Sequence, residues 1–339
     1  MAIILNNGEF ISTLSEATGF KAGLALNKKQ ILELFDESDY FHKVLSLDDS
    51  ASIRLYSENI DEIFVHILNK LGATERTSSV PSSIQIYHKY KDDPELSTIS
   101  NHVHDMFISF LRQSMAEAMK TGNKVMDPTP FMKQAFKQYG KVGLDMSYEF
   151  VAGNSEDLHC KLSGYSRVEW NDVIELESLF SSESLDAMYG KFIDQRYIDF
   201  LHKNTDKLGE MHWRKFEGLT AEYFDREGYN VDIGSGRNDG GIDVRVWKSE
   251  DSKSEPPLML VQCKRYKNKV EKTVVKALWA DVQWENAESG LIVTTSEMSP
   301  GAQKDCVARG YNIQQADKSI LRNWLEQMKT PGSGIFMSK

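Results

Sequence analysis

Hydrophobic residues recur at helical spacing through most of the first 200 positions of the chain. Spacing of this kind predicts helices, here over residues 28–45, 58–71 and 98–120. The Asp127–Pro128 and Thr129–Pro130 pairs predict the start of another helix, over about 131–139. Two short segments, 84–90 and 144–151, are expected to be extended, and 183–208 is expected to be a connecting helix. The first 200 residues are therefore predicted to be a mainly helical α+β region.

The pattern changes near residue 212, where short apolar strands begin to alternate with helices. Helices are predicted over 213–227, 271–286 and 319–328 and from Pro300 onward, and strands over 229–233, 241–247, 258–265, 290–294 and 312–315. This αβββαβαβα order predicts an α/β domain with a mixed sheet and helices on both faces. We therefore expect two domains, an N-terminal region at 1–200 and an α/β domain at 201–339.

Charge is distributed unevenly between these two parts. The chain of 339 residues has a net charge of −10, but residues 1–200 hold 19 Lys and Arg against 30 Asp and Glu, and residues 201–339 hold 21 against 20. Residues 257–280 form a local basic cluster with one acid, Glu271. Such a cluster can bind phosphate on an acidic chain, because charges more than about 10 Å away are screened by salt.

Composition excludes several classes of protein. No apolar run approaches the ~20 residues of a membrane span, and the N-terminus lacks the basic and apolar segments of a secretory signal. Three cysteines far apart do not predict a disulfide framework or a structural zinc site. We expect a cytoplasmic protein without a membrane partner.

Candidate chemistry lies on two neighbouring strands. Because side chains alternate along a strand, Gln262 and Lys264 are expected to project side by side, and Cys263 to point the other way into the core. A hairpin connection would bring Asp243 next to Gln262 and Lys264, and Glu217 on the preceding helix could reach the same point. Hard oxygen ligands of this kind suit Mg²⁺, and a nearby lysine can stabilise negative charge that develops on a phosphoryl group. The residues predict metal-assisted phosphodiester hydrolysis.

At these residues the chain resembles a known family. Phe216–Glu217, the segment Gly236 to Asp243, Val261 to Tyr266 and Gly290 to Thr295 are similar to the Mrr-type restriction endonuclease catalytic domain, a branch of the PD-(D/E)xK nucleases, over about residues 213–328. The resemblance implies a restriction-endonuclease-like fold. It also implies Asp243 as principal metal ligand, Gln262 in place of the usual second acid, Lys264 as catalytic lysine and Glu217 as the helical acid.

The leading hypothesis is a Mg²⁺-dependent deoxyribonuclease, similar to type IV restriction enzymes, with Mn²⁺ as an alternative ion. The resemblance places it in a bacterial restriction or anti-phage system, where residues 1–200 would control or recruit it, through another defence protein. A homo-oligomer is expected. Two alternatives stay open, a nuclease-like scaffold that binds DNA without cutting and a repair or Holliday-junction nuclease. The residues expected to contact DNA are Arg237, Arg265, Lys267, Lys269 and Lys272.

Overall fold

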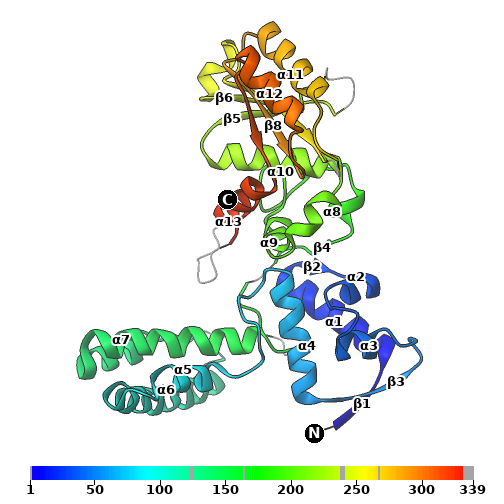
Figure 1. The fold of residues 1–339 in the computed structure, drawn as a ribbon. Coiled ribbons are helices and arrows are strands. Elements are labelled where there is room, and N and C mark those ends of the chain that lie inside the picture. The colour runs from blue at the N-terminus through cyan, green and yellow to red at the C-terminus, as the bar shows by residue number, and fades with distance from the viewer. Residues whose placement is uncertain are drawn as a thin grey trace. The chain divides into compact units, whose positions relative to one another are not determined.

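The computed structural model describes residues 2–122, 126–162, 165–168, 170–236, 241–265 and 268–330 (Figure 1). The chain forms two compact units. The first contains residues 1–21, 31–69 and 74–171, and the second contains residues 22–30, 70–73 and 172–339. The boundary expected at residue 200 falls inside helix α9 (Gln195–Lys203), so the compact units divide the chain elsewhere.

The first unit is mainly helical, as predicted, with one small sheet. Strands β1 (Ala2–Asn6) and β3 (Ser52–Tyr56) pair in antiparallel fashion, although about 50 residues separate them. The helices are α1 (Asn7–Ala22), α2 (Lys28–Glu33), α3 (Tyr40–Leu45), α4 (Ser57–Lys70), α5 (Ser82–Tyr90), α6 (Pro94–Thr121) and α7 (Thr129–His159). Helices α1 and α2 cross the boundary between the two units.

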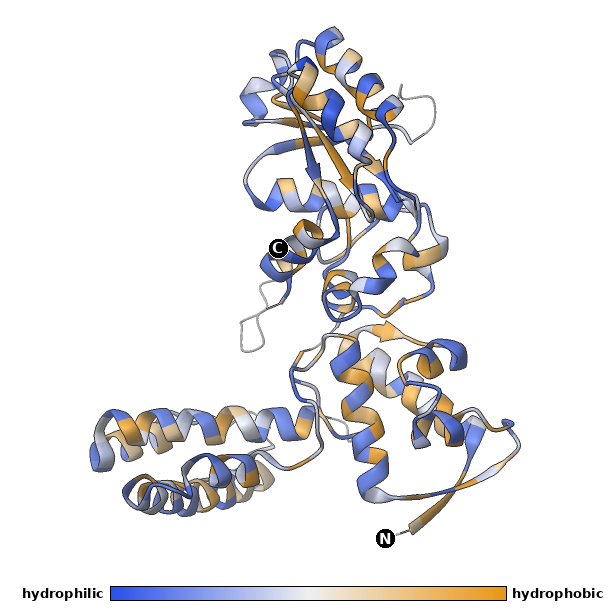
Figure 2. Cartoon of the chain, in the orientation of Figure 1, coloured by the Kyte–Doolittle hydropathy of each residue, from blue (hydrophilic) through white to orange (hydrophobic). Residues whose placement is uncertain are grey.

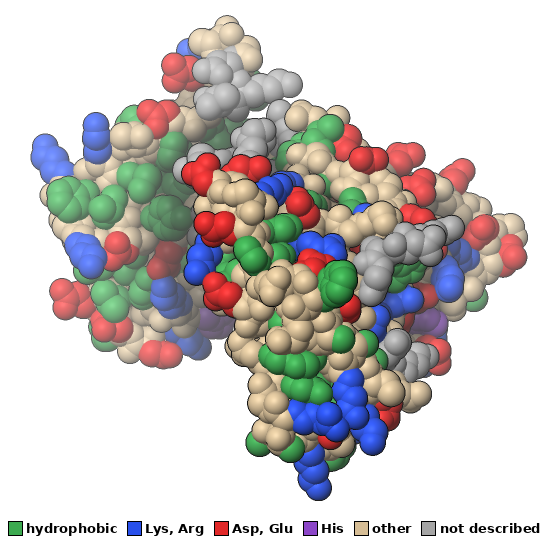
Figure 3. Space-filling model, turned by 90° about the horizontal axis from the view of Figure 1, so that it is seen from above, with side chains coloured by type: hydrophobic (Ala, Val, Ile, Leu, Met, Phe, Trp, Pro, Cys, Tyr) green, Lys and Arg blue, Asp and Glu red, His purple; other side chains and the backbone are tan. Residues whose placement is uncertain are grey.

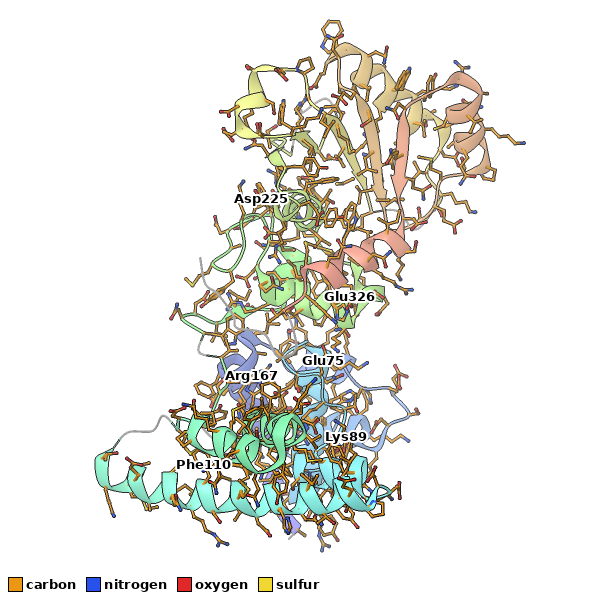
Figure 4. The ribbon with its side chains drawn as sticks, turned by 90° about the vertical axis from the view of Figure 1, so that its left-hand side faces the viewer. Glu75, Lys89, Phe110, Arg167, Asp225 and Glu326 are labelled. Carbon is orange, nitrogen blue, oxygen red and sulfur yellow. The ribbon has the colours of Figure 1, made fainter. Side chains whose placement is uncertain are left out.

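Helices α6 and α7 form a long helical hairpin against which α5 packs (Figures 1 and 4). Its core is aromatic, with Phe107 5.4 Å from Phe131 and 5.9 Å from Phe150 between ring centroids. Asp93 begins α6 by accepting hydrogen bonds from the backbone N–H groups of Glu95 and Leu96, a favourable arrangement at a helix start. Residues 84–90 and 144–151, which were expected to be extended, lie in α5 and in α7 of this hairpin, so both predictions are wrong.

The two wrong predictions share a cause. Residues 84–90 belong to α5 and residues 144–151 to α7. A short apolar segment can fit the alternating pattern of a strand almost as well as the spacing of a helix. Packing within the helical hairpin therefore decides which of the two structures forms. The expected connecting helix at 183–208 is also wrong, since α9 covers only Gln195–Lys203 of that range.

A buried lysine ties α1 to the end of α7 in the first unit. The Lys21 ammonium donates to the backbone carbonyls of Leu158, His159, Lys161 and Tyr165, and the residue is 1% exposed. The last carbonyls of a helix have no partner within the helix. Lys21 therefore supplies both hydrogen bonds and a positive charge where α7 ends.

A buried arginine, Arg196, connects the first segments of the second unit. Short strands β2 (Leu24–Ala25) and β4 (Ile174–Glu175) pair in parallel, followed by α8 (Ser178–Ser181), α9 and a 3₁₀ turn at Thr205–Gly209. Arg196 donates to the carboxylates of Asp194 and Asp172 and to the carbonyl of Gly23. These bonds explain why residues 22–30 and 172–200 belong to the second unit.

The second unit contains the predicted α/β arrangement. Five strands lie in the order β5 (Asn230–Ile233), β6 (Val244–Trp247), β7 (Met259–Lys264), β8 (Ser289–Thr294) and β9 (Ile313–Ala316). The β5–β6 and β6–β7 pairs are antiparallel, and the β7–β8 and β8–β9 pairs are parallel. The helices are α10 (Trp213–Arg226), α11 (Lys272–Trp284), α12 (Pro300–Arg309) and α13 (Lys318–Met328), so the predicted element order is confirmed.

Both faces of this sheet are covered. Leu260 and Ile292 pack with Val275 and Leu278 of α11 and with Ala302 of α12 in one buried cluster. Helix α10 contacts β5, β6 and β7, and α13 contacts α10 and β9. The strands near the middle of the sheet are accordingly the most hydrophobic part of the unit (Figure 2). Across the residues described, no helix is both long and apolar enough to span a bilayer.

Candidate active site

Strands β6 and β7 separate at Asp243, one residue before β6 begins. The Asp243 N–H donates to the Val261 carbonyl (3.0 Å), and the Asp243 carbonyl accepts from the Gly234 N–H (2.9 Å). The Asp243 carboxylate then accepts from the backbone N–H of Cys263 at 2.6 Å. A side chain thus replaces the strand partner that Cys263 loses at the fork, as a buried N–H requires.

Helix α10 brings a second carboxylate to this fork. His212 begins the helix by accepting from the Arg214 N–H through its side chain (3.2 Å). Glu217, one turn further, is 4% exposed and forms a hydrogen bond with Asp243. Burial, and next the Asp243 charge, raise the pKa of Glu217 to about 8, while Arg214 opposes that rise. Two oxygen-bearing acids therefore face each other in a site sheltered from water.

Gln262 occupies the adjoining position on β7. Its Nε2 donates to the carbonyl of Gly241 at 2.9 Å, and within the described parts of the chain its buried Oε1 has no hydrogen-bond partner. Gly241 has φ +90°, and a Cβ there would lie 3.2 Å from Gln262 Nε2. A glycine is favoured at position 241 because other residues rarely adopt this positive φ, and the Gln262 amide lies close by. The unpartnered oxygen could therefore serve as a ligand for a cation.

Cys263 and Lys264 are the last two residues of β7, and Cys263 lies within reach of the charges of the two acids. Lys264 is half-buried, and its positive charge is felt at the Cys263 thiol, together with the negative charges of Asp243 and Glu217. Burial, followed by the Asp243 charge, holds the pKa of Cys263 well above its usual range. The Cys263 Sγ lies 3.5 Å from Thr220 Oγ1 on α10. Cys263 was expected in the core, away from the site, and its position beside the two acids is a correction.

That correction has a physical reason in the strand fork. Strict alternation would put Asp243 on the same face as Gln262, but Asp243 lies outside β6. Its carboxylate meets α10 instead, whereas Ile242 packs in the cluster beneath α11. In the structure, Asp243 interacts directly with Glu217. Gln262 is hydrogen-bonded to Gly241, two residues before Asp243.

The donor set fits a hard divalent cation. Two carboxylates and an unpartnered amide oxygen are the ligand types that Mg²⁺ and Mn²⁺ bind. Among the described side chains, no group of three or more His, Cys, Asp and Glu is arranged as a metal cluster. The third protein oxygen here would come from the neutral amide of Gln262.

The residues expected to contact DNA fall into three groups. Arg265 is engaged within the domain, where its Nη1 donates to the carbonyls of Glu210 (3.1 Å) and Met211. Lys269 is exposed and pairs with Glu297 at 3.1 Å, and Lys272 is exposed at the first turn of α11. Arg237 and Lys267 lie outside the described residues. On the face seen in Figure 3, basic side chains gather in groups separated by acidic ones.

Comparison with known proteins agrees with the resemblance found in the sequence. Residues 208–325 match the family model Mrr_cat, described as a restriction endonuclease. A solved structure, the MspJI restriction endonuclease in complex with a 27-mer oligonucleotide, is 21% identical with a TM-score of 0.28. That match covers 39% of this chain and 31% of the MspJI chain, about a third of its length. No curated protein matches the chain. The second unit thus contains, at residues 208–325, a match to the Mrr-type restriction endonuclease domain.

Proposed function

We propose that this protein is a metal-dependent DNA endonuclease. One observation carries the proposal: Glu217 and Asp243 meet at the fork between β6 and β7, and Gln262, which is hydrogen-bonded to Gly241 two residues before Asp243, keeps an unpartnered buried oxygen. The restriction endonuclease family match over the same residues supports a DNA substrate. The ion would be Mg²⁺, with Mn²⁺ as a substitute.

Each residue has a distinct part in this proposal. Asp243, Glu217 and the Gln262 oxygen hold the ion, which when bound polarises the phosphoryl group and makes a water molecule more acidic. The strand end and α10 fix these oxygens in place before DNA arrives. Lys264, the residue that follows Cys263 at the end of β7, would stabilise the negative charge that develops on the phosphate.

Residues 1–200 are proposed to control or recruit the nuclease and not to bind DNA themselves. Their 30 acidic residues against 19 basic ones disfavour contact with phosphate. A partner from the same restriction or anti-phage system would bind this region, and a homo-oligomer would supply two cutting sites. Both statements rest on the resemblance to restriction enzymes, and the domain boundary near residue 200 stays a prediction.

Nicking of supercoiled plasmid tests the proposal. The full chain should convert plasmid to the open-circular form with Mg²⁺ or Mn²⁺, and EDTA should stop the reaction. DNA binding without cutting, at every metal concentration, would contradict the proposal and favour the scaffold alternative. Cutting confined to branched substrates would favour a junction nuclease instead.

A further inference from the structure

Arg214 occupies an unusual place for a basic residue. It lies in the first turn of α10, which has no acidic residue. The N-terminus of a helix carries partial positive charge, so a cation there is disfavoured. Another interaction must therefore favour an arginine at this position.

Glu217 provides that interaction. Arg214 Nη1 donates to Glu217 Oε2 at 2.8 Å, with the arginine side chain 16% and the glutamate side chain 6% exposed. The spacing i,i+3 places both on one face of the helix. A charge-assisted hydrogen bond sheltered from water restricts the rotamers of the carboxylate more than an exposed ion pair does.

The guanidinium also lies close to the backbone at Gly236. A Cβ at Gly236, where the β5–β6 turn leaves the sheet, would lie 3.2 Å from Arg214 Nη1 and 2.9 Å from the Trp213 ring. Gly236 thus lies close to Arg214, with no room for a side chain between them. The arginine lies between the backbone near Gly236 and the carboxylate of Glu217.

We propose that Arg214 is a positioning residue of the nuclease site. It keeps Glu217 directed at Asp243 and offsets the repulsion between the two carboxylates, so that the oxygens are arranged before a cation binds. This inference rests on the proposed function, because it takes these oxygens as cation ligands. Loss of a group that orients a metal ligand typically weakens metal binding by about 10–100-fold.

The direct test is to measure Mn²⁺ binding to the full chain, without DNA, by electron paramagnetic resonance. Arg214→Met should raise the Mn²⁺ dissociation constant by about 10–100-fold. Arg214→Lys should recover part of that loss, since it keeps the charge but not the geometry of the guanidinium. In nicking assays, the metal concentration for half-maximal rate should shift more than the rate at saturating metal.

Arg226 offers a matched control on the same helix. Its Nε donates to the buried Glu222 at 2.8 Å, and the other partners of this pair are the Met328 carbonyl and the backbone N–H groups of Lys191 and Phe192, none of them a proposed metal ligand. Arg226→Met should leave Mn²⁺ affinity unchanged in protein that circular dichroism shows to be folded. Wild-type Mn²⁺ affinity in folded Arg214→Met, or tighter binding, would overturn the positioning role.

The two proposals fail in different ways. If the wild-type chain binds Mn²⁺ and Arg214→Met binds it weakly, while neither nicks DNA, the positioning role holds and the nuclease function does not. If both proteins bind Mn²⁺ equally and the wild-type chain nicks plasmid, only the positioning role is wrong. A wild-type chain that binds no Mn²⁺ would overturn the role together with metal dependence.

Discussion

Asp243 combines a structural and a chemical role within one side chain. Its carboxylate accepts from the Cys263 N–H at 2.6 Å and also faces Glu217. Truncation to alanine would leave the N–H without its acceptor, and an unsatisfied buried group of this kind costs about 1–3 kcal/mol. The informative substitution is therefore asparagine, which retains an acceptor oxygen and removes the charge.

We expect Asp243→Asn to remain folded and to lose nicking by at least about 10²-fold, because an oriented charge is lost at the reacting centre. Lys264→Met should lose activity to a similar extent. The measurement is plasmid nicking at saturating Mg²⁺, with thermal melting as the check on folding. Asp232→Asn is the control, since Asp232 is an acid of β5 that pairs with Lys253 at 3.0 Å. Full activity in Asp243→Asn would exclude it as principal metal ligand.

Glu217 predicts a pH dependence in the metal-free protein. Its pKa is about 8 in the folded chain against an ordinary value of 4.5, so the folded state keeps a proton that the unfolded state releases. The stability of the folded state therefore falls as pH rises from about 4.5 to about 8. Each pKa unit corresponds to about 1.4 kcal/mol. Glu217→Gln should melt at a higher temperature than wild type at pH 9, with little difference at pH 4.

Glu222 provides the matching control for this experiment. Its carboxylate accepts from the backbone N–H groups of Lys191 (2.9 Å) and Phe192 (2.8 Å) and from Arg226. Glu222→Gln should therefore lower the melting temperature at both pH values. Mg²⁺ should narrow the gap between wild type and Glu217→Gln at pH 9, because only the wild type gains fully from binding. Equal melting curves for both proteins at pH 9 would contradict the paired carboxylates.

Residue types and spacing were enough to predict Glu217, Asp243, Gln262 and Lys264 as candidate residues. The structure directly joins the first two and places Gln262 against the turn before Asp243. Alternation along a regular strand could not predict which face of the sheet the Asp243 carboxylate lies on. Asp243 lies outside β6, and its carboxylate points toward α10. The position of Cys263 near the two acids depends on that same departure from regular geometry.

At the scale of secondary structure, prediction succeeded where the apolar pattern of a segment and the turn residues at its ends indicated the same element. The strands of the second unit are short, apolar and bounded by turns, and all five occur near the predicted positions. The β1–β3 pair was not predicted, because each strand is only five residues long and the pairing is distant in sequence. Segments 84–90 and 144–151 were wrong because the aromatic core of the helical hairpin decides their conformation.

The β5–β6 turn gives a prediction at this scale. Gly236 has φ +81°, and an added Cβ would lie 2.9 Å from Trp213 and 3.2 Å from Arg214. Gly236→Ala should therefore destabilise the fold by more than the ~1 kcal/mol of conformational strain alone and should raise the Mg²⁺ concentration needed for nicking. Gly228 has φ +90° and nothing within 4 Å, so Gly228→Ala isolates the strain. Identical melting and metal titration curves for the two variants would show that the turn does not press on α10.

Over the whole molecule, the two parts of the chain differ clearly in net charge. The acidic excess belongs to residues 1–200, while Lys269, Lys272 and Lys276 lie in or next to α11 of the second unit. Lys269 and Lys276 form ion pairs with Glu297 and Asp305 at 3.1 and 3.2 Å, which DNA phosphates would have to replace. Exposed ion pairs of this kind contribute little to stability, so exchanging them for phosphate contacts costs little.

The full chain should therefore bind DNA through this basic cluster. Replacing Lys269, Lys272 and Lys276 together by glutamine should weaken binding to any sequence and reduce the slope of log affinity against log salt, by at most about 0.9 for each phosphate that the variant no longer neutralises. The control is a second triple variant, with glutamine for the three exposed lysines of α7, Lys133, Lys137 and Lys141. Fluorescence anisotropy with a labelled duplex at several salt concentrations measures both quantities. If the α7 variant lost as much affinity and salt dependence as the α11 variant, residues 1–200 would contact DNA, and their proposed role as a purely regulatory region would be wrong.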